Sequence, residues 1–231
     1  IPVSRSSAVL PEHREFERFA TTALNAYVAP RMSEYLSTLR LSLQQLGLGV
    51  APEIMSSSGG SWPFEQMVQL PINSMLSGPA GGVIGAVSLA ETLAIDNVIT
   101  YDMGGTSTDT CLVRDRQYPL AAEGNIGGLP NRAAQIEINT VGAGGGSLAY
   151  LDEGGFLNVG PRSAGAVPGP ACYGRGGCEP TVTDANVVLG RFRPTSALGG
   201  EITIDVAAAV AAVESLGQKL KLGLNETAEG I

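Results

Sequence analysis

The chain has 231 residues, of which 44% are hydrophobic and 16% are charged, with a formal net charge of −8. This composition can form a sizeable core and excludes wholesale disorder. The acidic balance excludes nucleic acid as a general partner, because few cations are available to neutralise a phosphate backbone. No apolar stretch has the roughly 20 residues of a membrane span, and residues 1–25 lack signal-peptide architecture. We therefore expect a cytoplasmic protein that contacts no membrane.

The numbers and positions of histidine, cysteine and glycine limit the kinds of site that this chain can form. His13 is the only histidine and the three cysteines have no zinc-type spacing, which excludes a histidine-rich metal centre built from this chain alone. Reduced thiols are expected, and a Cys172–Cys178 disulfide is left open. The 31 glycines are roughly twice the average usage of about 7%, and 17 of them lie between Gly104 and Gly177. Because apolar runs interrupt the glycines, we interpret this region as ordered. Its backbone groups would then make contacts that side chains make in other proteins.

Residues 11–45 have helical periodicity. Apolar residues recur there at steps of three and four, at Phe16, Phe19, Ala20, Leu24 and Tyr27, and then at Met32, Tyr35, Leu36, Leu39, Leu43 and Leu46. Pro30 is expected to break this segment into two helices or to kink it, and Gly47 to end it. Both apolar faces are expected to pack on a core.

Strands and helices then alternate, which is typical of an α/β layer architecture. We expect strands at 51–55, 72–76, 97–101 and 110–113, a loop at 56–60, a turn at 77–82 and a helix at 83–93. Short apolar pieces at 136–141, 148–151 and 156–159 lie among glycine- and proline-rich turns, which indicates a β-rich insertion over about residues 120–180. Two further helices are expected at 184–189, with Thr183 or Asp184 as N-cap, and at 206–216.

The strongest local signal is the segment 101–109. A β-branched strand leads there to an acid, two glycines, three hydroxyl residues and a second acid, which are Asp102, Gly104, Gly105, Thr106, Ser107, Thr108 and Asp109. The glycines can adopt positive φ and let backbone N–H groups approach phosphate oxygens, to which the hydroxyls can also donate. Asp102 or Asp109 can hold Mg²⁺ or orient an attacking group. The alternative interpretation is an ordinary hairpin turn.

Two further segments carry candidate site residues. The run 142–147 follows a strand and can cradle phosphate or admit a substrate carbonyl, which makes candidates of Gly144, Gly145, Gly146 and Ser147. Its alternative is a bulged turn, and a Rossmann dinucleotide fingerprint is not present. In the loop 161–177, Arg162 and Arg175 can each pair with a carboxylate or phosphate, or form a surface salt bridge. We favour the salt bridge for Arg175 and leave both open for Arg162. Packing is favoured over a nucleophilic role for Cys172.

The segment 77–86, followed by a strand and then Asp102–Thr106, resembles the small-residue helix and second phosphate hairpin of the actin, sugar-kinase and heat-shock ATPase superfamily. In that superfamily the small residues let a helix lie close to its counterpart in the other lobe. Gly81, Gly82, Gly85 and Ala86 would permit such an approach here, although small faces more often mean only tight packing.

The chain is similar to the hydantoinase A/oxoprolinase family over nearly all of its length. The resemblance rests on ordered blocks at 14–18, 25–27, 54–60, 77–82, 142–147, 160–166, 168–177 and 181–185. It departs from the family pattern because the first phosphate hairpin and the later adenosine-type turn do not occur in these residues. The chain is therefore expected to be a middle segment cut at both ends. A helical segment, 1–70, would lead into an α/β lobe, 71–231.

The resemblance implies ATP-dependent opening of a cyclic amide, such as a hydantoin or 5-oxoproline, through phosphorylation of the carbonyl oxygen. It implies ATP and Mg²⁺ as cofactors and a second, B-type subunit or domain as partner. Asp102 and Asp109 would lie near metal or water, Gly104–Thr108 on phosphate, and Gly144–Ser147 near the reacting carbonyl. The alternatives are a subunit of an acetone- or acetophenone-type carboxylase and a non-catalytic scaffold domain. We expect the isolated chain to be inactive.

Overall fold

The computed structural model describes residues 3–192, 197–198 and 202–231. Its contacts divide the chain into two compact units. One comprises Ile1–Thr100 and Thr110–Asn139, and the other comprises Tyr101–Asp109 and Thr140–Ile231. Residues 71–100 therefore group with the helical segment 1–70, and the hairpin turn groups with the C-terminal part of the chain.

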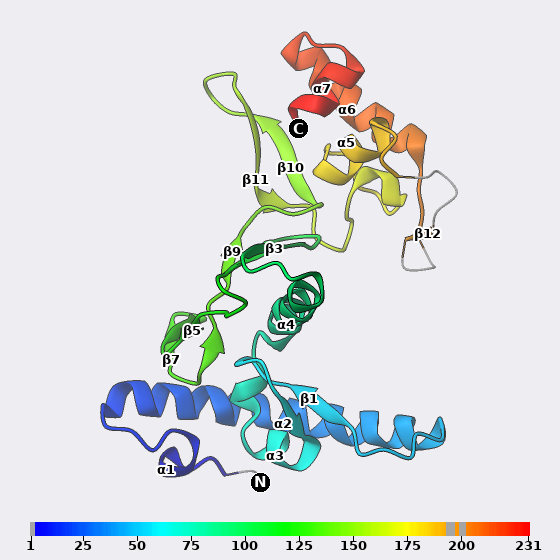
Figure 1. Ribbon diagram of the computed structural model, residues 1–231. Coiled ribbons are helices and arrows are strands. Elements are labelled where there is room, and N and C mark those ends of the chain that lie inside the picture. Colours follow the sequence, from blue (N-terminus) through cyan, green and yellow to red (C-terminus); the bar gives the residue numbers. More distant parts are fainter. Residues whose placement is uncertain (1–2, 193–196, 199–201) are drawn as a thin grey trace. The chain divides into compact units, whose positions relative to one another are not determined.

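The first unit is built on α2 (Glu15–Gln45), which follows the one-turn helix α1 (Ser6–Val9) (Figure 1). Of the two alternatives expected for Pro30, the break into two helices is wrong, because α2 continues through it, and the kink stays a prediction. Proline lacks the N–H that would bond to the carbonyl of Ala26, but both residues are exposed, so water can solvate that carbonyl. Gly47 ends the helix as predicted. It has a φ of 77°, and the N–H of Leu48 donates to the carbonyl of Leu43.

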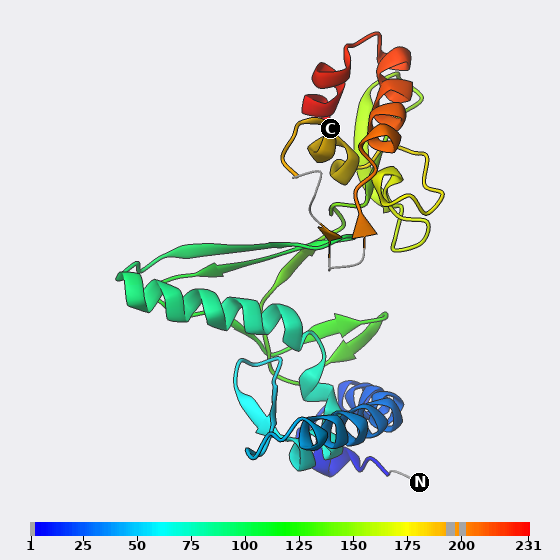
Figure 2. The ribbon, with the colours of Figure 1, turned by 90° about the vertical axis from the view of Figure 1, so that its right-hand side faces the viewer.

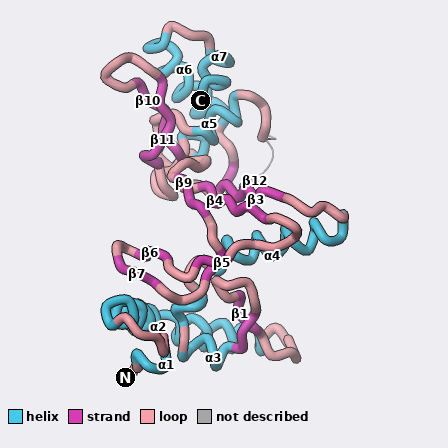
Figure 3. The backbone as a smooth tube through the Cα atoms, turned by 60° about the vertical axis from the view of Figure 1, so that its left-hand side comes forward, coloured by secondary structure: helices cyan, strands magenta, loops and turns pink. Residues whose placement is uncertain are grey.

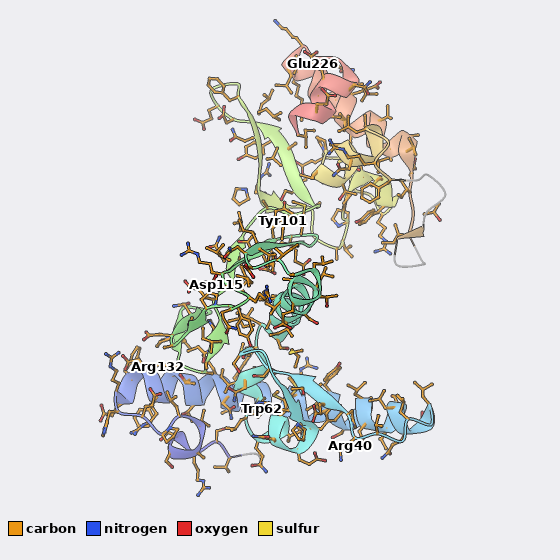
Figure 4. The ribbon with its side chains drawn as sticks, viewed as in Figure 1. Arg40, Trp62, Tyr101, Asp115, Arg132 and Glu226 are labelled. Carbon is orange, nitrogen blue, oxygen red and sulfur yellow. The ribbon has the colours of Figure 1, made fainter. Side chains whose placement is uncertain are left out.

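The buried face of α2 differs from the one that its periodicity predicts. Several of the predicted core residues are more than half exposed, namely Phe16, Phe19, Tyr27 and Tyr35. The residues that α2 buries are Ala20, Thr21, Leu24, Asn25, Ala29 and Leu36. Two of these are polar and have specific partners. The amide oxygen of Asn25 accepts from the N–H of Ile72 at 3.2 Å, and the hydroxyl oxygen of Thr21 accepts from the N–H of Arg132 at 3.1 Å. Figure 4 labels Arg132 beside α2.

Between α2 and the next long helix lie four short elements. β1 (Glu53–Met55), within the strand predicted at 51–55, pairs antiparallel with β2 (Ser61–Pro63), and α3 (Phe64–Gln69) follows. The strand predicted at 72–76 is wrong, because residues 71–74 form the 3₁₀ helix η1 (Pro71–Ser74). Pro71 at its first position fixes a φ that suits a helical turn and lacks only an N–H that would have no partner there.

The helix α4 (Ser77–Leu93) includes the residues for which a turn was predicted, 77–82. Leu76, with a φ of 64°, redirects the chain immediately before it, and Pro79 lies in its first turn, where a missing N–H costs no helical hydrogen bond. Ala80 and Val83 pack against Cys111 and Val113 in the core of this unit. Both partners lie on one strand, Thr108–Val113, and Figure 2 shows α4 alongside it.

One sheet has three strands, in the order β3 (Val98–Met103), β4 (Thr108–Val113) and β9 (Asn139–Val141). The strands predicted at 97–101 and 110–113 are thereby confirmed. Two small antiparallel ladders lie between β4 and β9 in sequence: β5 (Leu120–Ala121) with β8 (Gln135–Ile136), and β6 (Gly124–Ile126) with β7 (Leu129–Asn131). They confirm that the insertion is rich in β structure.

The second unit packs an antiparallel ladder against helices, as Figure 3 shows. The ladder pairs β10 (Ser147–Leu151) with β11 (Leu157–Ser163). The helical elements are the 3₁₀ helix η2 (Ala171–Tyr173), α5 (Val182–Val188), α6 (Val206–Leu220) and α7 (Leu224–Gly230), and a short ladder pairs β12 (Ala197–Leu198) with β13 (Ile202–Thr203). α6 confirms the helix predicted at 206–216. The buried apolar residues among those described are contributed by β10, η2, α5, α6, α7 and Ile204.

The N-cap of α5 is Thr181, so the prediction of Thr183 or Asp184 is wrong. The hydroxyl oxygen of Thr181 accepts from the N–H of Asp184, and the Asp184 carboxylate accepts from the N–H of Thr181, which makes a reciprocal capping box. Within the part of the chain that the structure describes, no helix is both long and apolar enough to cross a membrane.

Candidate functional site

The predicted phosphate-binding segment is the turn between β3 and β4, and its residues 101–109 lie in the second unit. The N–H of Gly104 donates to the carbonyl of Ser107 at 2.8 Å and closes the turn. Gly104, Gly105 and Thr106 are exposed, whereas Thr108 is buried. Neither glycine has a positive φ, which corrects the expectation from sequence. Tyr101, labelled in Figure 4, precedes the turn and is 66% exposed.

The turn is held by the glycine run 142–147, which sequence analysis had treated as a separate candidate. The N–H of Gly145 donates to the carbonyl of Gly104 at 2.9 Å, and the N–H of Gly146 donates to the carbonyl of Gly105 at 2.6 Å. In a planar trans peptide the N–H points opposite to the C=O. The N–H groups of Gly105 and Thr106 therefore point away from the two donors, Gly145 and Gly146, and both residues are exposed. Two consecutive N–H groups held in this way suit an anion.

The glycines of this run are required by close packing. A Cβ on Gly144 would lie 2.7 Å from the nitrogen of Thr106 and 2.8 Å from the nitrogen of Ser107, and one on Gly146 would lie 2.8 Å from the carbonyl oxygen of Gly105. Backbone atoms cannot move aside as a flexible side chain can. Any side chain at these positions would therefore push the turn away from the run.

Hydrogen bonds within the second unit hold the run itself. The hydroxyl oxygen of Ser147, which is fully buried, accepts from the N–H of Gly144 at 2.8 Å. The N–H of Ala164 donates to the carbonyl of Gly146 at 2.8 Å, and the hydroxyl of Thr108 donates to the carbonyl of Ala143. The structure thus brings Gly144–Ser147 together with Gly104–Thr108. The predicted contact between this run and a reacting carbonyl remains a prediction.

The two acids of the turn are in different environments. Asp102 is exposed at the end of β3, and the side chain of Asp109 accepts a hydrogen bond from the hydroxyl of Thr140 at 2.6 Å. No group of three or more His, Cys, Asp and Glu side chains that could enclose a metal occurs among the described residues. Mg²⁺ does not need such a cage, because it commonly binds one or two carboxylates together with water and phosphate oxygens. The exposed carboxylate of Asp102 fits that donor set, in which phosphate oxygens bound by the two N–H groups would be further ligands.

Arg162 has partners of its own on β11. Its guanidinium lies 3.9 Å from the carboxylate of Glu179, and its carbon Cζ lies 4.9 Å from the ring centre of Tyr150. Arg162 and Glu179 are both more than half exposed, so this pair contributes little to stability. The predicted contact of Arg162 with substrate or phosphate remains a prediction.

The three cysteines are free thiols. Cys172 is fully buried, and its burial together with the neighbouring carboxylate of Asp184 raises the pKa of its thiol. Burial also raises the pKa of Cys111. A thiol with a raised pKa is a poor nucleophile at neutral pH, which agrees with the packing role expected for Cys172. Cys178 is exposed.

Sequence reasoning missed three residues that position the site: Thr140, which bonds to Asp109, Thr183 and Asp184. Thr183 donates to the carbonyl of Gly145 through both its N–H and its hydroxyl, each at 2.8 Å. Asp184, fully buried, accepts from the N–H groups of Ala171, Cys172 and Thr181 and from the Thr181 hydroxyl. The spacing of Thr181 and Asp184 is a capping-box signal that could have identified Asp184. No local sequence pattern predicts the hydrogen-bond partners of Thr140 or Thr183.

The chain superposes on two solved structures of ATP-dependent proteins. The chain superposes on a nucleotide-free structure of acetone carboxylase with a TM-score of 0.82 at 29% identity, covering 97% of this chain and 32% of that one. The ATP-dependent caprolactamase from Pseudomonas jessenii gives a TM-score of 0.78 at 39% identity, covering 97% of this chain and 33% of that one. The fold is thus α/β, part of the actin, sugar-kinase and heat-shock-type ATPase fold, with a glycine-rich β insertion.

The profile of the hydantoinase/oxoprolinase family matches residues 18–231, and the chain belongs to this family. It is 41% identical over 224 residues to the caprolactamase subunit alpha of Pseudomonas jessenii, covering 96% of this chain and 32% of that protein. It is 41% identical over 227 residues to 5-oxoprolinase 1 of Arabidopsis thaliana, covering 95% of this chain and 18% of that protein. The chain therefore spans a third or less of these relatives, and the resemblance inferred from sequence is confirmed.

Proposed function

We propose that the complete protein containing this chain opens a cyclic amide, such as a hydantoin or 5-oxoproline, at the expense of ATP. The observation that carries this proposal is the turn of residues 104–107, whose two hydrogen-bonded carbonyls direct the N–H groups of Gly105 and Thr106 outward. The name of the caprolactamase relative, an ATP-dependent enzyme, supports an amide as substrate class.

The chemistry follows from the weak electrophilicity of an unstrained amide. In the proposed first step, the amide carbonyl oxygen forms a bond to the γ-phosphorus of ATP while the bond from that phosphorus to the bridging oxygen breaks and ADP leaves. Water then adds to the activated carbon. The C–N bond of the adduct breaks, with the nitrogen taking up a proton, which opens the ring and leaves an acyl phosphate. A second water hydrolyses the acyl phosphate to a carboxylate and free phosphate. The N–H groups of Gly105 and Thr106 would bind the transferred phosphoryl oxygens, and the hydroxyls of Thr106 and Ser107 would donate to them.

The two acids of the turn would act on the phosphates through a bound metal ion or water. Asp102 would hold Mg²⁺, which neutralises phosphate charge when bound. Asp109, oriented by Thr140, would align water or the ion. Gly144–Ser147 and Arg162 are proposed as the neighbouring substrate or phosphate loop. The three free thiols support a cytoplasmic location, and the relative named as an alpha subunit supports a second, B-type subunit as partner.

A carboxylase subunit is the second candidate, because the structure with the TM-score of 0.82 is acetone carboxylase. Measuring which substrate stimulates ATP hydrolysis by the complete protein distinguishes the amide-opening enzyme from the carboxylase. We expect 5-oxoproline, a hydantoin or a larger lactam to stimulate it, and acetone or acetophenone with bicarbonate to leave it unchanged. Stimulation by the ketones alone would favour the carboxylase, and an absence of ATP binding in calorimetry would favour a scaffold.

Asp102→Asn tests the role of the turn directly. It removes the charge at nearly constant size, so it should abolish ATP turnover by the complete protein, as followed by phosphate release. Asp115→Asn is the matched control: Asp115 is an exposed acid in another turn, with a φ of 49° that asparagine tolerates. The control should retain turnover. Near-normal turnover in Asp102→Asn would exclude the assigned role.

A further inference from the structure

Thr183 connects α5 to the glycine run through two hydrogen bonds to one acceptor. Its N–H and its hydroxyl both donate to the carbonyl of Gly145 at 2.8 Å, and Thr183 itself is 6% exposed. A Cβ on Gly145 would lie 2.8 Å from the hydroxyl oxygen of Thr183, so the two residues are packed as closely as a glycine allows. The position of Gly145 is thus defined by Thr183.

The same glycine determines the orientation of the turn. Gly145 donates through its N–H to the carbonyl of Gly104, and its neighbour Gly146 donates to the carbonyl of Gly105. These two bonds orient the peptides whose N–H groups point outward. An unbroken path of hydrogen bonds therefore runs from Thr183 to Gly145 and from Gly145 to Gly104.

The beginning of α5 is itself rigidly anchored. The carboxylate of Asp184, next to Thr183, accepts hydrogen bonds of 2.8 to 3.2 Å from the N–H groups of Ala171, Cys172 and Thr181. It is fully buried, and its fourth donor is the hydroxyl of Thr181 at 2.7 Å. Charge-assisted bonds of this kind are about twice as strong as neutral ones. These hydrogen bonds therefore fix the start of α5, where Thr183 lies.

From this path we infer that Thr183 is a positioning residue for phosphate binding, acting through Gly145 on the turn of residues 104–107. It contacts neither phosphate nor substrate. Its hydroxyl holds Gly145 in place, and Gly145 and Gly146 in turn orient the peptides that carry the N–H groups of Gly105 and Thr106. This inference rests on the proposed function for its consequence in catalysis, but the mechanical link rests on the hydrogen bonds alone.

Thr183→Val tests the inference in the complete protein, because valine keeps the shape and the N–H bond and removes only the hydroxyl. We expect kcat/KM for ATP to fall about tenfold, the equivalent of one hydrogen bond of about 1.4 kcal/mol. Thr183→Ser restores the hydroxyl and should recover kcat/KM to within about twofold.

Thr227→Val is the matched control. Thr227 is a fully buried threonine of the same unit, and its hydroxyl donates to a glycine carbonyl, that of Gly223, at 2.8 Å. It should lower the Tm about as much as Thr183→Val and leave kcat/KM for ATP unchanged. An equal fall of kcat/KM in both valine variants, or no recovery with serine, would overturn the inference.

Hydrogen exchange separates this inference from the proposed function. Without nucleotide, Thr183→Val should speed amide exchange in the peptides that cover residues 103–109 and 144–147, and Thr227→Val should not. A wild-type protein that neither binds nor hydrolyses ATP would refute the proposed function, yet the exchange difference should persist. Unchanged exchange in Thr183→Val would refute the mechanical link whatever the activity.

Discussion

Two glycine-rich segments of this chain differ in how closely their glycines are packed. In the run 142–147, a Cβ on Gly144 or Gly146 would lie 2.8 Å or less from backbone atoms of the turn. In α4, a Cβ on Gly78, Gly82 or Gly85 would meet nothing within 4 Å. The contacts of the first segment explain its composition. These three glycines of α4 weaken a helix without any compensating contact among the described residues, so glycine content alone does not reveal what a segment does.

Removing the anchor beneath the glycine run should give the largest effect. Asp184→Ala leaves the N–H groups of Ala171, Cys172 and Thr181 buried without their acceptor, which should cost about 3 kcal/mol or more of the free energy of unfolding. Urea unfolding of the chain measures this cost. Alkylation at pH 8 gives a second measurement. Cys172, with its raised pKa, should resist in the wild type while Cys178 reacts, and it should become reactive in the variant.

Asp152→Ala is the control for that comparison. Asp152 also holds a turn, accepting from the N–H groups of Gly154 and Phe156, but at an exposed site, where these hydrogen bonds lower the pKa of its carboxyl. Because water can replace it as acceptor, we expect a smaller loss of stability and no labelling of Cys172. A loss as large as that of Asp184→Ala would show that burial is not what makes the anchor strong.

Gly144→Ala tests the close approach directly. The added methyl group would lie 2.7 to 2.8 Å from three backbone atoms of the turn, so we expect a loss of about 1–3 kcal/mol in the chain and no ATP turnover in the complete protein. Thermal unfolding and phosphate release measure the two effects. Gly142→Ala adds the same methyl group 3.7 Å from Pro161, an ordinary contact, and should change little. Equal effects of the two substitutions would contradict the packing argument.

Gly82→Ala should have the smallest effect and the opposite sign. With open space around the new methyl group and helical backbone on both sides, the chain should gain up to about 1 kcal/mol of stability. Urea unfolding measures this gain. If α4 meets another part of the complete protein, as the superfamily resemblance implies, the same variant would be stable but impaired there. A less stable 231-residue chain would mean that the exposed face of α4 already has a partner within it.

Elements with a strong local signal were predictable. The strands that carry the turn are apolar and bounded by polar residues, and the helix at 206–216 is alanine-rich and capped by Asp205. The start of α4 was missed because Gly78, Pro79 and two further glycines have the composition of a turn. The helix starts there because the backbone turns at Leu76 and because Ala80 and Val83 pack in the core. Local composition indicates neither feature.

The candidate site was predictable in its parts and not in its assembly. The segments 101–109 and 142–147 stood out as glycine runs after strands, but their contacts join carbonyl and N–H groups that every residue possesses. No sequence pattern specifies which backbone groups meet. The same limit applies to Thr183. Its hydroxyl donates to a carbonyl 38 residues away, whereas the sequence around it predicts only the start of a helix.

The bonds that hold the turn also set the order in which the site can form during synthesis. The hairpin leaves the ribosome first, its glycine run follows later, and Thr183 with its anchor comes last. Until residue 184 has emerged, the nascent chain carries an unsupported turn with exposed strands, the kind of surface that recruits chaperones. We expect slow synthesis across residues 147–184 to prolong that interval and to lower the yield of folded protein.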